Sequence, residues 1–278
     1  MRATIATSPA RPDQPNEDFA AACATGAVLL DGAGLSGTTT KCVHGVAWYA
    51  RHLGGALLAG LPDPDRPLPA VLADGIRETA ALHADPCRLE DDPGTPSATV
   101  IMVRVAGARL EYLVLSDSVL LLVPAGAGAP VVITDNRADE VRGTARQQLD
   151  AMPGGTPEHA EALRRHVQSS WEYRNRPGGF WVAAADPSVA DEAIVGDLPL
   201  GDVASVALLS DGASRIVDLF GLADWPAAAA LLGHAGPDEL IRRVRAAEDE
   251  DPRGAKWPRG KAHDDATVAY CVDLAVTA

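Results

Sequence analysis

The sequence predicts an α+β fold in which antiparallel sheets are covered by helices. Hydrophobic residues make up 47% of the 278 residues, which is enough to bury a sizeable core. Short strands rich in β-branched and aliphatic residues follow one another in hairpin order, a pattern typical of antiparallel sheets. Helical segments with long apolar spacing occur between them, without a clear boundary or a repeat of fixed period. We therefore expect a single domain over residues 1–278.

The individual elements follow from the period of the apolar residues. The turn Ala106-Gly107-Ala108 separates two strand-like segments and predicts a hairpin. The segments with helical spacing are residues 38–61, 69–84, 137–152, 157–174, 214–222 and 237–250. The strand-like segments are residues 27–30, 97–105, 109–115, 118–123, 130–134, 179–185, 203–209 and 267–276.

Charge and composition exclude several classes of protein. With 38 Asp and Glu against 24 Lys and Arg, the net charge is −14, which disfavours binding to nucleic acid or to an anionic membrane. The apolar stretches are too short for a signal peptide or a membrane span. The four cysteines form no C-x-x-C pair and predict neither a zinc ribbon nor a disulfide framework, so we expect a reduced, cytoplasmic setting. His44 and His52 are interpreted as packed or surface residues of a helix.

Carboxylates at the ends of predicted strands are the most informative pattern. Asp31 and Asp211 each follow an apolar strand and precede a glycine. Asp117 also ends a strand, and Asp264 lies just before the last one. A buried strand holds such a side chain at the rim of its sheet, and the glycine allows a sharp turn. Asp18, in the sequence Asn-Glu-Asp, is a further candidate.

Several carboxylates at one rim cannot all be ionised without a cation between them. Oxygen ligands favour Mg²⁺ or Mn²⁺ over softer metals, and two such ions roughly 3.5–4 Å apart can activate water and bind phosphoryl oxygens. A single Asp-Gly pair is more often an ordinary turn. Asp117 is also compatible with a turn cap, and Asp264 with a solvated loop. The joint interpretation rests on the order and context of all these residues.

This order resembles that of the type 2C protein phosphatases, the metal-dependent PPM family of serine/threonine phosphatases, in a divergent bacterial-type form. The matching motifs are residues 16–18 (Asn-Glu-Asp), 28–34 (Val-Leu-Leu-Asp-Gly-Ala-Gly), 97–100 (Ser-Ala-Thr-Val), 115–118 (Leu-Ser-Asp-Ser), 133–136 (Ile-Thr-Asp-Asn), 208–212 (Leu-Leu-Ser-Asp-Gly) and 264–268 (Asp-Asp-Ala-Thr-Val). The resemblance implies a four-layer α-β-β-α sandwich, two stacked antiparallel sheets flanked by helices. It also implies hydrolysis of phosphoserine or phosphothreonine in a protein substrate, by water activated between two Mg²⁺ or Mn²⁺ ions.

The resemblance also implies roles for individual residues. Asp31 would bridge the two ions, and Gly32 would offer its carbonyl. Asp211 and Asp264 would complete one coordination shell, so that Asp31, Asp211 and Asp264 form the catalytic set. Asp18 would act through coordinated waters, and Asp117 would help to hold a third ion. Glu17 and Asp265 would lie behind these ligands.

The chain departs from the family pattern at several positions. Ala33 stands where some members carry a histidine proposed as a general acid, and Ser116 replaces a glycine. Asp265 replaces an asparagine and adds negative charge. Arg11 is the nearest equivalent of the phosphate-binding arginine, at a longer spacing than expected. Asn136 and Val119 also differ from the family residues, a histidine and an arginine.

These departures leave two alternatives to an active phosphatase. One is a catalytically weak or inactive protein of the same fold that serves as a regulatory or binding module. The other is an unrelated carboxylate metal-binding protein, which would explain the aspartates but not their order. We favour the active phosphatase because the residues expected to bind metal are all present.

Overall fold

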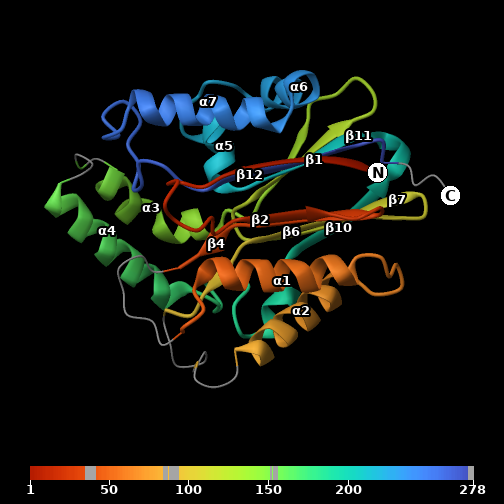
Figure 1. The fold of residues 1–278 in the computed structure, drawn as a ribbon, viewed down its shortest axis with the longest axis horizontal. Coiled ribbons are helices and arrows are strands. Elements are labelled where there is room, and N and C mark those ends of the chain that lie inside the picture. The colour runs from red at the N-terminus through yellow and green to blue at the C-terminus, as the bar shows by residue number, and fades with distance from the viewer. Residues whose placement is uncertain (35–41, 84–86, 88–93, 151, 153–155, 275–278) are drawn as a thin grey trace.

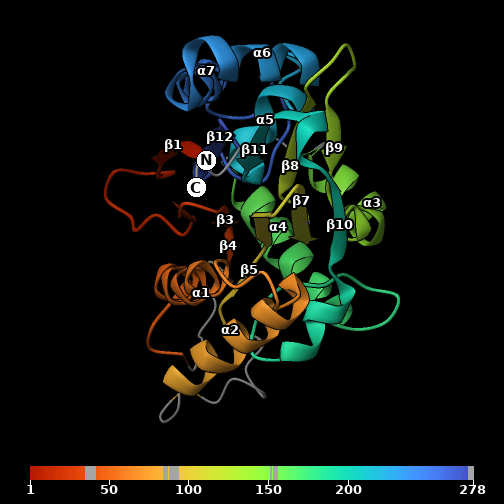
Figure 2. The same ribbon diagram turned by 90° about the vertical axis from the view of Figure 1, so that its right-hand side faces the viewer.

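The structure, a computed structural model, consists of four layers (Figures 1 and 2). It describes residues 1–34, 42–83, 87, 94–150, 152 and 156–274. Two antiparallel five-stranded sheets form the middle layers, and helices cover both outer faces. The predicted α+β class and the α-β-β-α sandwich are confirmed.

The first sheet has the strand order β10-β7-β6-β3-β2, with every neighbouring pair antiparallel. Its strands are β2 (Phe19–Ala22), β3 (Gly26–Leu30), β6 (Val100–Ala106), β7 (Arg109–Leu115) and β10 (Ile194–Pro199). The predicted hairpin is confirmed as β6 and β7, and Gly107 adopts the positive φ of 59° that its tight turn requires. A short extra pair, β4 (Gly32–Ala33) and β5 (Ser97–Ala98), lies beside this sheet.

The second sheet has the order β1-β12-β11-β8-β9. Its strands are β1 (Arg2–Ser8), β8 (Val119–Pro124), β9 (Val131–Ile133), β11 (Val203–Leu209) and β12 (Ala266–Val272). Leu29 and Ile101 of the first sheet share one buried cluster with Leu120 and Leu208 of the second. The inner faces of the two sheets therefore pack directly against each other.

Helices complete the outer layers. The pair α1 (Val46–Gly60) and α2 (Leu68–Leu82) packs on the first sheet through Leu53, Leu57 and Ile76. The second sheet is covered by α5 (Asp211–Asp218), α6 (Trp225–Ala235) and α7 (Pro237–Glu250). Helices α3 (Arg137–Asp150) and α4 (Pro157–Ser170) lie at the end of the sandwich near β4 (Figure 1). Within the described residues, every helix is too short or too polar to cross a membrane.

Several predicted boundaries are wrong. The helix predicted over 38–61 begins at Val46, after Gly45 with φ 79°, and residues 38–41 lie outside the described part. Residues 179–185 form no strand and make only isolated bridges, because this segment crosses the edge of β5 instead of joining a sheet. The predicted helix at 214–222 begins earlier, at Asp211, and ends at Asp218. The last strand ends at Val272, short of the predicted 276; residues 275–278 are not described.

Some elements were not predicted at all. Strand β10 carries Gly, Asp and Pro, residues that disfavour strands, and it joins the sheet as an edge strand paired with β7. Strand β2 is almost entirely alanine, and α6 is alanine-rich, so neither shows a clear apolar period. Strand β1 is an edge strand with mostly exposed or half-buried residues.

Candidate metal centre

The topology brings four of the predicted strand-end carboxylates to one edge of the sandwich. Strands β3 and β7 both run antiparallel to β6, so Asp31 and Asp117 leave the first sheet at the same edge. Strands β11 and β12 are antiparallel, so Asp211 follows one strand where Asp264 precedes the other. The backbone N–H of Asp211 donates to Asp31 Oδ2 at 3.1 Å, which joins the two sheets at this edge.

Asp31 is fixed by a polar junction between β3 and the start of β6. Its carbonyl accepts from the Thr99 N–H at 2.9 Å, and its own N–H donates to Thr99 Oγ1 at 3.2 Å. The Thr99 hydroxyl contacts that of Ser118, the residue after Asp117, at 2.6 Å. The sequence motifs around these residues are therefore hydrogen-bonded neighbours, and they hold Asp31 and Asp117 in fixed relative positions.

Ser116 and Asp117 form a strained corner at the end of β7. Ser116 has φ 71°, in the left-handed region where glycine is favoured. Its hydroxyl donates to Asp117 Oδ1 at 3.2 Å. The glycine that the family carries at this position is thus explained by backbone conformation, and the serine adopts the same conformation despite its side chain.

Asp211 is held by the junction between β11 and β12. The Ser210 N–H donates to the Thr267 carbonyl at 3.0 Å, and the Thr267 N–H donates to Ser210 Oγ at 2.9 Å. Asp211 begins α5, and Gly212 lies so close to the Asp265 carbonyl that an added Cβ would be 2.0 Å from that oxygen. Glycine is therefore required here by close backbone approach, not by an unusual φ.

Asp18 carries the clearest sign of a missing partner. Its side chain is only 7% exposed, and both carboxylate oxygens are buried without a hydrogen-bond partner. Burial raises the pKa of Asp18 to about 7, partly offset by the hydroxyls of Thr267 and Ser210. Burial of such a carboxylate is costly, and a nearby cation or its bound water would satisfy it.

The other carboxylates are destabilised by one another. Burial raises the pKa of Asp31 well above its usual range, and repulsion from Asp211 and Asp18 adds to the effect. Desolvation by the surrounding protein, followed by repulsion from Asp264, raises the pKa of Asp211. Divalent cations would remove both penalties, and oxygen donors suit Mg²⁺ or Mn²⁺. The residues present therefore fit the ions expected from the sequence.

Asp264 differs because two cations already accompany it. Its Oδ2 accepts from Arg215 Nη2 at 2.8 Å, and its Oδ1 contacts Lys261 Nζ at 2.8 Å. Burial alone would raise the pKa of Asp264, but Lys261 and Arg215 lower it. Sequence reasoning missed both cations. The available signals were Arg215 four residues after Asp211 on one helix face, and Lys261 three residues before Asp264.

The remaining predicted residues lie around this centre. Asp265 accepts two backbone N–H groups, from Ala10 at 2.6 Å and Glu17 at 2.7 Å, and so fastens the segment before β2 to the start of β12. The Glu17 carbonyl lies against Gly32, and burial raises the pKa of the Glu17 carboxyl. Arg11 is exposed and faces the same cavity as Asp31.

The cavity beside the centre has a volume of about 1070 Å³ and is open to solvent. Asp31, Gly32 and Asp264 form part of its wall, and α4 forms another part through His159. Several cationic side chains also line it, although the chain as a whole is strongly acidic: Arg11, Arg164, Arg253, Arg259 and Lys261. The cavity therefore combines carboxylates that suit metal ions with cations that suit an anionic ligand.

Replacing Arg215 with Met should destabilise the fold by about 2 kcal/mol, because the buried carboxylates Glu248 and Asp264 each lose one of two cationic partners. Arg215 Nη1 lies 2.6 Å from Glu248 Oε1, and the Glu248 side chain is fully buried. Arg242→Met is the matched control, since Arg242 forms an exposed pair with Glu239 on α7 and should cost less than about 0.5 kcal/mol. Urea denaturation measures the free energy of unfolding of both variants. Equal losses of stability would contradict the proposed contribution of the buried ion pair.

Comparison with known proteins gives a consistent structural result. Neither a protein-family model nor a curated protein sequence matches the chain. The catalytic domain of the serine/threonine protein phosphatase PstP in complex with two manganese ions is similar, with 21% identity and a TM-score of 0.55 over 97% of this chain and 96% of that one. The Mycobacterium tuberculosis phosphatase PstP/Ppp is 19% identical, with a TM-score of 0.55 and 97% of each chain covered.

The serine/threonine phosphatase Stp1 from Staphylococcus aureus is 12% identical, with a TM-score of 0.56 over 97% of this chain and 94% of that one. At such identities the likeness concerns the fold alone. It extends over nearly the whole chain, as the order of the sequence motifs predicted. The chain therefore has the fold of the PPM-type serine/threonine phosphatases.

Proposed function

We propose that this protein is a cytoplasmic Mg²⁺- or Mn²⁺-dependent phosphatase that hydrolyses phosphoserine or phosphothreonine in a protein substrate. The observation that carries the proposal is the convergence of Asp31, Asp211 and Asp264 beside the buried, unpartnered carboxylate of Asp18. The similar PstP structure contains two manganese ions, which supports the same kind of centre here. We treat residues 1–278 as one catalytic domain.

In this proposal, Asp31 would hold both ions and Gly32 would contribute its carbonyl. Asp211 and Asp264 would hold one of these ions, Asp18 would act through water, and Asp117 would contribute to a weaker third site. When bound, the two ions lower the pKa of water and offset negative charge on the phosphoryl oxygens.

The chain's own cations have a separate task. Lys261 and Arg11 line the cavity beside the carboxylates, where they can bind and orient the phosphate group of a substrate. Asp264 and Asp211 raise the pKa of Lys261, so this side chain remains a cation throughout the physiological pH range. Arg215 orients Asp264 from behind, through its second contact with Glu248. With Ala33 in place of a histidine, protonation of the leaving oxygen falls to solvent or to another group on the cavity wall.

The test is hydrolysis of an aryl phosphate and of a phosphothreonine peptide by the purified chain. We expect turnover with Mn²⁺ or Mg²⁺, its loss on adding a chelator, and its return when the metal is restored. A malachite green assay for free phosphate measures its release from the peptide directly. Metal binding is followed in parallel by calorimetry.

The two measurements together separate the alternatives. A chain that binds Mn²⁺ at the carboxylates but hydrolyses neither substrate would support a non-catalytic binding module. Absence of Mn²⁺ binding at the carboxylates would contradict the proposed metal centre itself. Phosphatase activity that persists unchanged in excess chelator would contradict the proposed role of the ions.

A further inference from the structure

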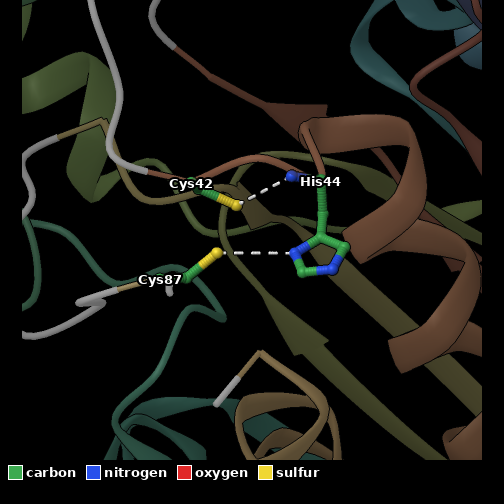
Figure 3. A group of neighbouring side chains, drawn as sticks. All are labelled: Cys42, His44 and Cys87. Carbon is green, nitrogen blue, oxygen red and sulfur yellow. Dashed lines mark hydrogen bonds between the residues drawn. The ribbon is translucent and has the colours of Figure 1, made fainter. Parts of the chain in front are cut away.

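A second group of metal-ligand side chains lies outside the carboxylate centre. Cys42 and His44 precede α1, and Cys87 follows α2, so residues far apart in the sequence meet at one end of this helix pair. One ligand atom from each lies within 4.8 Å of the others. Figure 3 shows the two sulfur atoms and the His44 ring pointing toward one another. The sequence analysis did not identify this group, because Cys42 and Cys87 are 45 residues apart and form no C-x-x-C pair.

A fourth candidate ligand comes from the end of α2. His83 Nε2 lies 3.4 Å from Cys42 Sγ, and the His83 side chain is fully buried. Its other ring nitrogen, Nδ1, is buried and has no hydrogen-bond partner. The pair His83 and Cys87 are four residues apart, a spacing common among ligands of structural zinc sites.

We propose that Cys42, His44, His83 and Cys87 form a structural zinc site. Two thiolates and two imidazoles are a common donor set for structural Zn²⁺ and suit it better than Mg²⁺ or Mn²⁺. On a tetrahedral zinc, a sulfur at about 2.3 Å and a nitrogen at about 2.0–2.1 Å lie about 3.5 Å apart. Cys87 Sγ lies 3.5 Å from His44 Nδ1, and Cys42 Sγ lies 3.4 Å from His83 Nε2.

The surroundings also suit a metal-bound thiolate. The His44 backbone N–H donates to Cys42 Sγ at 3.4 Å, the kind of outer contact that stabilises a ligand sulfur. The Trp48 ring packs against both imidazoles, with centroid distances of 4.3 Å to His44 and 4.6 Å to His83. This packing limits rotation of the two rings and orders the ligands before binding.

The position of the site suggests its purpose. Helices α1 and α2 are joined at one end by a short loop, and the proposed zinc would join their opposite ends. Val46, the first residue of α1, packs against Gly32 and Gly34. An added Cβ would lie 2.6 Å from the Val46 side chain at Gly32 and 2.3 Å from it at Gly34. Zinc would thus fix the start of the helix against which the Gly32 segment rests.

The experiment uses the full chain, purified under reduction and stripped of metal. We expect it to bind one equivalent of Zn²⁺ that excess Mn²⁺ does not displace, with a rise in Tm of about 5 °C or more. With Co²⁺ in place of zinc, thiolate-to-metal charge-transfer bands and tetrahedral d–d bands should appear. The cobalt spectrum of the unaltered chain needs no variant, so it remains informative even if a variant fails to fold.

Matched variants test which residues bind the zinc. The double variant Cys42→Ser/Cys87→Ser should lose this zinc and the charge-transfer bands. Cys23→Ser should keep both, because Cys23 lies between β2 and β3 and its sulfur contacts Thr25. Asp31→Asn should also keep the thiolate-bound zinc, which separates this site from the carboxylate centre.

Three results would overturn the proposal. The first is the absence of zinc binding at micromolar concentration in the reduced chain. The second is unchanged zinc and cobalt binding in the double variant. The third is a Cys42–Cys87 disulfide that mass spectrometry detects in the chain kept under reduction, which would make the pair a redox bond instead of a metal ligand set.

Discussion

Replacing Asp31 with Asn is expected to reduce metal-dependent phosphate release by about 10³-fold or more, since the proposed bridging ligand for both ions is removed. The same variant should be more stable than the unaltered chain when both are free of metal. Asp31 has a raised pKa because of burial and the surrounding carboxylates, so the neutral amide removes a destabilising charge at neutral pH. Initial rates with Mn²⁺ and thermal unfolding in chelator measure the two effects.

The control for this prediction is Asp197→Asn. Asp197 lies on β10 and forms an exposed ion pair with Arg109, far from the cavity. It should change neither activity nor stability by more than a small amount. An Asp31→Asn protein that keeps most of its Mn²⁺-dependent rate would exclude Asp31 from the proposed role.

Gly212→Ala should destabilise the chain by several kcal/mol, about 3 or more. The added Cβ would lie 2.0 Å from the Asp265 carbonyl oxygen, which is backbone and cannot rotate away. Either α5 or the segment at 264–265 must move, and both carry proposed ligands. We therefore expect weaker Mn²⁺ binding as well as a lower midpoint in urea.

Gly55→Ala is the matched substitution in an open position. Gly55 lies within α1, and an added Cβ there meets no atom within 4 Å. Alanine is the better helix former, so this variant should gain about 0.5–1 kcal/mol. Stability changes of opposite sign in the two variants would show that crowding of the added Cβ, not the loss of glycine as such, determines the destabilisation. A Gly212→Ala protein as stable as the Gly55→Ala protein would contradict the close approach.

The strand-end pattern was sufficient to predict the convergence of the carboxylates, and the hairpin order of the strands predicted antiparallel sheets covered by helices. Asp31 and Asp211 follow short apolar runs that form the buried strands β3 and β11, and a glycine follows each aspartate. The two stacked sheets were implied by the resemblance of the motif order to that of the type 2C protein phosphatases. The roles of the carboxylates as metal ligands remain predictions that the experiments above test.

Contacts between distant segments could not be predicted in the same way. No local pattern shows that Arg215 meets Glu248 and Asp264, because α5, α7 and the 261–265 segment come together only in the folded chain. Cys42 and Cys87 likewise become neighbours only through the packing of α1 on α2. Strand β10 was not predicted because its edge position tolerates Gly and Pro, which a central strand would not.

At Ser116, the side chain that restrains the neighbouring carboxylate also makes the local backbone conformation less stable. A left-handed serine costs about 1 kcal/mol relative to glycine, yet here its hydroxyl restrains the Asp117 carboxylate. A glycine would relax the backbone while giving the neighbouring acid more rotational freedom. The chain thus tolerates local strain next to a proposed ligand of the third ion, so the most stable sequence at this corner and the best ordered one need not be the same.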